Sequence, residues 1–314
     1  MPTLTSNAPQ AIYPNLSVWS RLPREYAIPE QPPSEAQARE YCERLARTHY
    51  ENFSVATWFL PKALRQHFFN VYAYCRISDD LGDEVGDPAA SLELLNQWEC
   101  ELEACYAGHP RHPVLVALAE TVRQFDIPKQ PFSDLLKAFR QDQTVTRYQT
   151  FEDLLGYCRY SANPVGHLVL YVCGYRDAER QALSDFTCTT LQLANFWQDV
   201  SLDYAKGRIY LPLEDLQCYG VNEDDIAAGR NTSQFCEVMR FEVERAREWF
   251  AKGLPLAATV DRDLAIDIEL FTRGGQEILN AIERQKYAVL DNRPVISKTR
   301  KLRLLARAAL GKLL

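Results

Sequence analysis

Apolar residues recur at intervals of three and four positions along most of the chain, which is the period of α-helices packed on a core. Short breaks marked by Pro or Gly separate the periodic segments, near positions 61, 86–88, 108–113, 128–131 and 207–212. Strand signals are scarce, and no internal repeat or Gly- or Ser-rich linker interrupts the pattern. The pattern therefore predicts an all-α fold, a single-domain helical bundle with its functional groups inside.

The first 33 residues depart from this periodicity. They hold seven of the 17 prolines and show no apolar stripe. They are predicted to form an extended or poorly ordered arm. Ser34 with Gln37 matches a capping box that would begin a helix, so the helical domain is expected to span residues 34–314.

Composition and charge narrow the class of protein. The 314 residues carry a net charge of -7, which argues against nucleic acid as a partner, because binding the phosphate backbone requires a basic surface. The nine cysteines are odd in number and contain no CxxC pair, which favours reduced thiols in the cytoplasm. No basic start precedes an apolar run, and no apolar stretch reaches about 18 residues, so neither a secretory signal nor a membrane-spanning helix is expected.

A first acidic cluster follows an apolar stripe between positions 64 and 84. The stripe consists of Leu64, Phe68, Val71 and Cys75. At about 100° per residue, four polar residues fall at its edge: Tyr72, Arg76, Asp79 and Asp83. Carboxylates beside apolar neighbours are costly unless a cation neutralises them, which indicates a binding site. The alternative is a solvated helix end that carries Asp79, Asp80, Asp83 and Glu84.

A second cluster changes this balance. Asn195, Asp199 and Asp203 are four positions apart and therefore lie on one face of a helix. That face also carries Cys188, Leu191 and Leu202, which predicts an inward aspect. Amide and carboxylate oxygens are hard ligands that suit Mg²⁺ rather than zinc.

Two such helices could clamp a diphosphate through bridging Mg²⁺ ions, because Mg²⁺ is usually held by one or two carboxylates plus phosphate oxygens. The ions would stabilise the leaving diphosphate, and the carbocation left behind would need a dry pocket with aromatic walls. Candidate aromatic residues are Phe53, Tyr72, Tyr157, Tyr160 and Phe196. Each of these taken alone is more often a core residue than a catalytic one.

Five ordered motifs together resemble the squalene and phytoene synthase family, over nearly all of the chain after residue 34. They are NFSVATWFLP at 52–61, YAYCRISDDLGDE at 72–84, YCRYSANPVG at 157–166, NFWQDVSLD at 195–203 and KGRIYLP at 206–212. The resemblance implies the fold of class I isoprenoid synthases, a requirement for Mg²⁺ and a prenyl diphosphate substrate.

The resemblance also assigns residues. The first aspartate motif of the family falls on Asp79, Asp80 and Asp83, and the second on Asn195, Asp199 and Asp203. These six residues would hold the metal ions. Catalytic positions would be Tyr72, Arg76, Tyr157, Arg208 and Tyr210. Substrate-binding positions would be Phe53, Arg76, Tyr160, Phe196, Gln198 and Arg293, of which Gln198 is a departure, since some relatives carry arginine there.

Within the family, three segments look most like the bacterial hydroxysqualene synthases of hopanoid pathways: ENFSVATWFLP, LANFWQDV and FTRGGQEIL. Such an enzyme would ionise presqualene diphosphate, open its cyclopropane ring and let water capture the cation, without NADPH. The alternative within the family is a squalene or phytoene synthase that condenses two prenyl diphosphates head to head. The alternative of another class is a non-catalytic helical scaffold, which the retention of both acidic motifs argues against.

Residues 296–314 contain six Lys or Arg and no acidic residue, and Leu302, Leu305, Ala309 and Leu313 lie close to one helical face. Two interpretations remain open. The segment is a closing helix packed on the bundle, or it is an interfacial helix attracted to anionic lipid. The second interpretation would place a cytoplasmic enzyme on the inner membrane surface.

Overall fold

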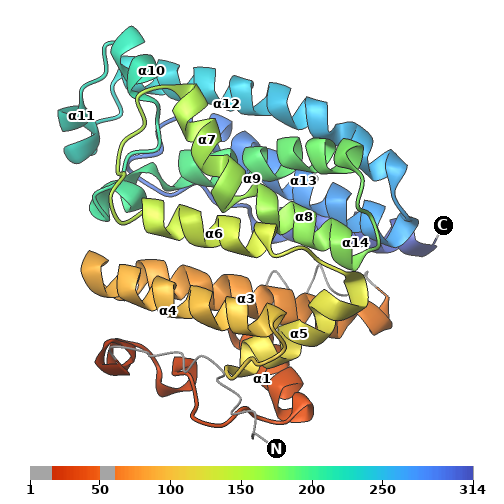
Figure 1. The fold of residues 1–314 in the computed structure, drawn as a ribbon. Coiled ribbons are helices and arrows are strands. Elements are labelled where there is room, and N and C mark those ends of the chain that lie inside the picture. The colour runs from red at the N-terminus through yellow and green to blue at the C-terminus, as the bar shows by residue number, and fades with distance from the viewer. Residues whose placement is uncertain (1–15, 50–60, 314) are drawn as a thin grey trace, which may run out of the picture.

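The computed structural model describes residues 16–49 and 61–313, which form helices joined by short loops (Figure 1). The described part contains no β-strand, only one isolated bridge between Arg147 and Ile209. The predicted all-α fold is confirmed. In chain order the elements are η1 (Leu16–Arg21), η2 (Arg24–Tyr26), α1 (Glu35–His49), η3 (Lys62–Leu64), α3 (Arg65–Asp83), α4 (Pro88–Tyr106), α5 (Pro113–Phe125), α6 (Gln130–Gln141), α7 (Phe151–Ser161), α8 (Asn163–Val172), α9 (Ala178–Ala205), α10 (Leu213–Cys218), α11 (Glu223–Ala227), α12 (Ser233–Gly253), η4 (Leu254–Thr259), α13 (Arg262–Arg284) and α14 (Lys298–Leu313).

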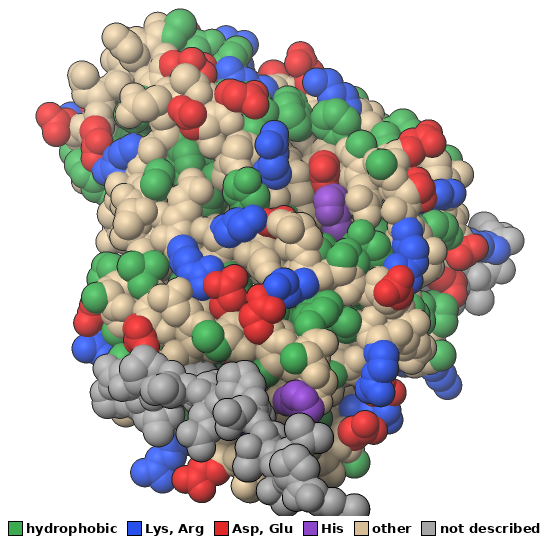
Figure 2. Space-filling view, in the orientation of Figure 1, with side chains coloured by type: hydrophobic (Ala, Val, Ile, Leu, Met, Phe, Trp, Pro, Cys, Tyr) green, Lys and Arg blue, Asp and Glu red, His purple; other side chains and the backbone are tan. Residues whose placement is uncertain are grey.

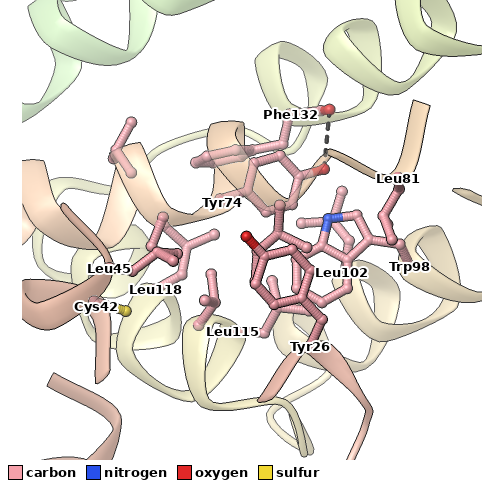
Figure 3. Close-up of a cluster of buried hydrophobic side chains, with 14 of the residues drawn as sticks. Tyr26, Cys42, Leu45, Tyr74, Leu81, Trp98, Leu102, Leu115, Leu118 and Phe132 are labelled. Atoms are coloured by element: carbon pink, nitrogen blue, oxygen red, sulfur yellow. Dashed lines mark hydrogen bonds between the residues drawn. The ribbon is translucent and has the colours of Figure 1, made fainter. Parts of the chain in front are cut away.

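The first of two hydrophobic cores lies among α1, α3, α4 and α5. Its centre holds Tyr74 and Trp98, whose rings stack 5.8 Å apart, and the Tyr74 hydroxyl donates to the Phe132 carbonyl oxygen at 3.1 Å (Figure 3). The predicted capping box is confirmed at the start of α1, because the backbone N–H groups of Ser34 and Gln37 each donate to the other residue's side chain.

The second core lies among α7, α9, α12 and α13, and α6 lies between the two cores (Figure 1). Both α6 and α8 contact helices of each core. Gly166 allows α8 to approach α9 closely, since a Cβ at this position would meet the Cys188 sulfur at 2.6 Å. Gly275 does the same for α13, where a Cβ would meet Leu191 Cδ2 at 2.8 Å. The long helix α9 is therefore fixed on two sides.

Within the predicted N-terminal arm, the described residues 16–26 are not extended, whereas residues 27–33 contain no helix. Residues 16–26 form η1 and η2 and place Trp19 and Tyr26 in the first core, 4% and 2% exposed. The Trp19 indole N–H donates to Gln97 Oε1 at 2.7 Å. The prolines prevent regular α-helix here but permit short 3₁₀ turns, and aromatic burial fixes them to the bundle.

Residues 298–313 form a helix that packs on α13, where Arg300 pairs with Glu277 at 2.7 Å. The helix does not bury the face that carries Leu302, which is 68% exposed. Ala306 and Ala309 on the same side are also exposed, and Leu305 is half-buried. The helix thus packs on the bundle through one side and presents an apolar strip on the other.

Candidate active site

The carboxylates at the C-terminal end of α3 differ in their exposure to solvent. Asp79 and Asp83 are partly exposed, with side-chain exposures of 47% and 22%, whereas Asp80 is buried. The Tyr26 hydroxyl donates to Asp80 Oδ2 at 2.6 Å, and Arg76 Nε donates to the same oxygen at 3.0 Å. Asp80 therefore joins η2 to Arg76, a link between the N-terminal segment and a predicted diphosphate-binding residue.

The second motif lies on α9, where the backbone departs from helical geometry at Asp199, with φ −107° and ψ 15°. The Asn195 amide donates to Asp199 Oδ2 at 2.6 Å, and Arg293 Nη2 donates to the same oxygen at 3.0 Å. The prediction that this face of the helix points into the bundle is correct only in part. Cys188 and Leu191 are half-buried, but Leu202 is 50% exposed because it follows the break at Asp199.

The loop after α9 brings the two acidic helices together. Both Nη atoms of Arg208 donate to Asp83 Oδ1 at 3.0 Å. The Lys206 ammonium lies 3.5 Å from the other oxygen of Asp83. Residues 125 positions apart in sequence thus form one ion-pair cluster, which contains the first motif and the basic residues after the second.

Burial and neighbouring carboxylates raise the pKa values of two of these carboxylates. Burial, followed by the nearby Asp83 charge, raises the pKa of Asp79 to about 6. Burial, followed by the Asp199 charge, raises the pKa of Asp203 to about 7. Lys206 lowers both pKa values but does not offset the effect of burial and of the neighbouring carboxylates.

The donor chemistry fits Mg²⁺, since Asp79, Asp83, Asn195, Asp199 and Asp203 offer only hard oxygen ligands. Within residues 16–49 and 61–313, however, no three His, Cys, Asp or Glu residues lie close enough together to hold a metal ion on their own. This arrangement suits an ion that keeps several waters and takes the remaining ligands from a substrate phosphate.

Four aromatic rings lie next to the carboxylates: Tyr148, Tyr157, Phe196 and Tyr210. Phe196 and Tyr210 stack with centroids 3.8 Å apart, and the Tyr157 ring lies 5.9 Å from the Tyr210 ring. The rings come from α7, α9 and the segments that precede α7 and follow α9, so they converge only in the folded chain. Aromatic faces attract cations, and the structure brings Tyr157 and Phe196, two of the predicted aromatic residues, into this cluster.

Sequence reasoning missed Tyr148 and Asp142, which both belong to this cluster. The Tyr157 hydroxyl donates to Asp142 Oδ2 at 3.0 Å, and Arg208 Nη2 lies 3.5 Å from the Asp142 backbone carbonyl oxygen. Asp142 ends α6 outside any periodic stripe, so no pattern in the sequence singles it out.

The remaining predicted residues lie in different surroundings. Tyr72 is half-buried beside the first core. Tyr160 has the Lys137 ammonium 5.3 Å above its ring. Gln198 is buried and donates to the Pro294 carbonyl oxygen, while its Oε1 accepts from Arg293 Nη2 at 3.3 Å. Gln198 thus anchors the segment that carries Arg293. Phe53 lies outside the described residues.

Comparison with known proteins agrees with the fold. The helical arrangement is that of isoprenoid synthases, and residues 46–300 match the squalene/phytoene synthase family. The chain belongs to the squalene/phytoene synthase family. It is therefore an enzyme of the prenyl-transferring type, in a family that binds prenyl diphosphates.

Individual relatives differ in their named activities. The chain is 32% identical to a phytoene synthase from Arthrospira platensis, over 89% of this chain and 94% of that protein. It is 45% identical to the solved structure of squalene synthase HpnC from Alicyclobacillus acidocaldarius, with TM-score 0.76, over 86% of this chain and 98% of the other. A dehydrosqualene synthase solved with a ligand is 28% identical with TM-score 0.79, over 88% and 96%.

Proposed function

We propose that this enzyme is a hydroxysqualene synthase, which ionises presqualene diphosphate and lets water capture the carbocation. The observation that carries the ionisation chemistry is the meeting of the two acidic helices, where Arg208 pairs with Asp83 beside Asp203. The choice of product is supported by the 45% identity to squalene synthase HpnC and by the motif segments described above.

In this proposal Asp79, Asp83, Asn195, Asp199 and Asp203 would hold Mg²⁺. When bound, Mg²⁺ neutralises the charge that develops on the leaving diphosphate. Asp80 is held by protein partners, so its role is to fix Arg76 rather than to bind metal.

Three arginines, Arg76, Arg208 and Arg293, would bind diphosphate oxygens. Guanidinium groups match phosphate geometry and keep their charge. Cleavage of the C–O bond leaves its electron pair on the diphosphate. The aromatic rings of Tyr157, Phe196 and Tyr210 then shelter the cation from bulk solvent until it reacts.

Mass spectrometry of the products tests the proposal directly. Pure enzyme with Mg²⁺ is incubated with presqualene diphosphate or with farnesyl diphosphate, each with and without NADPH. We expect hydroxysqualene from presqualene diphosphate in the absence of NADPH. Squalene formed only with NADPH, or presqualene diphosphate or phytoene-type products built from two prenyl diphosphates, would overturn the proposal in favour of a condensing or reducing synthase.

We also propose that α14 holds the enzyme against an anionic lipid surface of the cytoplasmic membrane. Its outward strip of Leu302, Leu305, Ala306 and Ala309 is bordered by the exposed Lys298, Lys301 and Arg303. Apolar residues flanked by basic ones are the pattern of helices that lie in the headgroup region. None of the described helices is both long and apolar enough to cross a membrane.

Co-sedimentation with vesicles tests this contact. We expect Leu302→Glu to lower binding to vesicles that contain phosphatidylglycerol several-fold, because it places a charge in the apolar strip. Leu254→Glu is a matched control, since Leu254 is 53% exposed on η4, outside the strip. Equal binding by wild type, folded Leu302→Glu and a variant that lacks 296–314 would contradict the proposal.

A further inference from the structure

Asp142 is a buried carboxylate beside the aromatic rings, and the roles assigned above do not use it. The residue is 8% exposed, and one of its oxygens, Oδ2, accepts the hydrogen bond from the Tyr157 hydroxyl at 3.0 Å. The other oxygen, Oδ1, is buried without a hydrogen-bond partner in the described protein. A buried carboxylate oxygen rarely goes unpaired, because the hydration lost on burial is then not replaced by another hydrogen bond.

The neighbours of Asp142 place this oxygen at the boundary between two parts of the site. The phenol of Tyr157 belongs to the rings that would shelter the cation, with its centroid 6.2 Å from Phe196 and 5.9 Å from Tyr210. The backbone oxygen of Asp142 faces Arg208, the residue that holds Asp83. Asp142 therefore connects the diphosphate side of the site with the cation side.

We propose that Asp142 Oδ1 holds the water molecule that captures the carbocation and accepts the proton that this water loses. The inference rests on the proposed function. The water oxygen forms the new C–O bond with the cation, and one water O–H bond breaks. Its proton passes to Asp142, which gives a neutral alcohol and a carboxylic acid that later releases the proton to solvent. No reductant or further reactant is consumed.

The surroundings of Asp142 suit both parts of this role. Tyr157 fixes one oxygen and so orients the other. Burial raises the pKa of Asp142 to about 7, and the charge of Arg208 opposes the shift. A carboxylate with a pKa near neutrality is a more effective proton acceptor than an ordinary exposed aspartate. The water would be directed at one carbon, because the carboxylate that holds it cannot rotate freely.

The test separates ionisation from capture. Asp142→Asn keeps an oxygen that can accept from Tyr157 but removes the proton acceptor. With presqualene diphosphate and Mg²⁺, we expect diphosphate release to fall less than ten-fold. The share of hydroxysqualene among the products should fall at least ten-fold, replaced by alkenes that arise when the cation loses a proton from carbon.

Asp215→Asn is the matched control, because Asp215 is also 8% exposed but pairs with Arg245 in the second core, outside the aromatic cluster. It should lower stability and leave the product ratio unchanged. A folded Asp142→Asn variant that still makes hydroxysqualene as its only product, whether its turnover is fast or slow, would overturn the inference. That result would leave the proposed function intact. Wild-type enzyme that makes no hydroxysqualene would instead overturn the proposed function.

If Asp142→Asn fails to fold, Tyr157→Phe replaces it. This variant keeps the carboxylate but releases Oδ2, so the carboxylate can rotate and the bound water loses its direction. We expect a several-fold smaller share of hydroxysqualene from Tyr157→Phe. An unchanged share in this variant would overturn the inference, because orientation of Asp142 would then have no effect on capture.

Discussion

Three basic side chains form ion pairs with carboxylates that are proposed to bind Mg²⁺. Arg208 and Lys206 contact Asp83, and Arg293 contacts Asp199. The ion pairs stabilise the acidic motifs in the absence of substrate, and they hold Arg208 and Arg293, two of the residues proposed to bind diphosphate, beside these motifs.

This arrangement predicts that Arg208→Met makes the fold respond to metal. Loss of the charge-assisted bonds to Asp83 should lower the free energy of unfolding by about 1–3 kcal/mol without metal. Mg²⁺ alone should then raise the Tm of the variant more than that of the wild type, because the ion replaces the missing positive charge. Thermal unfolding with and without Mg²⁺ measures both effects.

The matched control is Arg111→Met, which removes an arginine from the buried Glu101 at 3.0 Å, outside the site. It should lose stability without gaining a response to Mg²⁺, since Glu101 lies outside the two acidic motifs. Equal Mg²⁺ responses in the two variants would show that the effect is general and not specific to the acidic helices.

At the scale of elements, η1 and η2 are attached to the bundle by single aromatic residues. Tyr26 is labelled in the first core in Figure 3, and its hydroxyl reaches Asp80, which in turn holds Arg76. A short segment without regular helix thus fixes the position of a residue proposed to bind diphosphate. The segment affects the site through its hydrogen bond to the Asp80 carboxylate.

We expect Tyr26→Phe to lower the free energy of unfolding by about 1.5–3 kcal/mol, because it removes a hydrogen bond to a buried charge. It should also reduce kcat several-fold, since Asp80 then holds Arg76 less firmly. Tyr106→Phe is the control, because its hydroxyl donates to the neutral Ile127 carbonyl oxygen at 3.0 Å. Denaturant unfolding and steady-state kinetics measure the two effects, and equal kcat values would contradict the link.

The same elements show how far the sequence predicts the structure. The period of apolar residues predicts α3 and α9. The separation of four positions between Asn195, Asp199 and Asp203 predicts that they lie on one helix. It does not predict the break at Asp199 or the exposure of Leu202, because a pattern assumes an ideal helix. The burial of Trp19 depends on partners far along the chain, such as Gln97, which no local signal encodes.

At the scale of the whole molecule, charge is distributed unevenly between the surface and the site. The face shown in Figure 2 mixes acidic and basic side chains, whereas the acidic ends of α3 and α9 meet inside the fold. Carboxylates crowded there with raised pKa values hold protons more tightly in the folded chain than in the unfolded chain, where the aspartate pKa is about 3.9.

This difference predicts a pH dependence of stability in the absence of metal. The contribution of Asp79 and Asp203 is fully present below about pH 4 and is lost as the pH rises through about 6 to 7, because their charged forms are unfavourable in the fold. The double variant Asp79→Asn/Asp203→Asn should therefore be more stable than the wild type at pH 7.5, but not at pH 4.5. Urea unfolding at the two pH values measures the difference.

Asp225→Asn provides the control with opposite sign. Hydrogen bonding from Arg230 lowers the pKa of Asp225, so this variant should be less stable than the wild type at pH 7.5. If the Asp79→Asn/Asp203→Asn variant loses stability at pH 7.5 in the same way, the carboxylates of the site are not crowded in the folded enzyme.

Gly166 and Gly275, which let α8 and α13 approach α9 closely, limit how the enzyme can be redesigned. A methyl group at Gly166 or Gly275 would collide with atoms of α9 or α12, so neither position accepts a larger side chain without a shift of these helices. Libraries for directed evolution of chain length would lose most of their folded members at these positions. Sequence variation meant to change the product is better placed at other positions, so that α9 keeps its carboxylates in register.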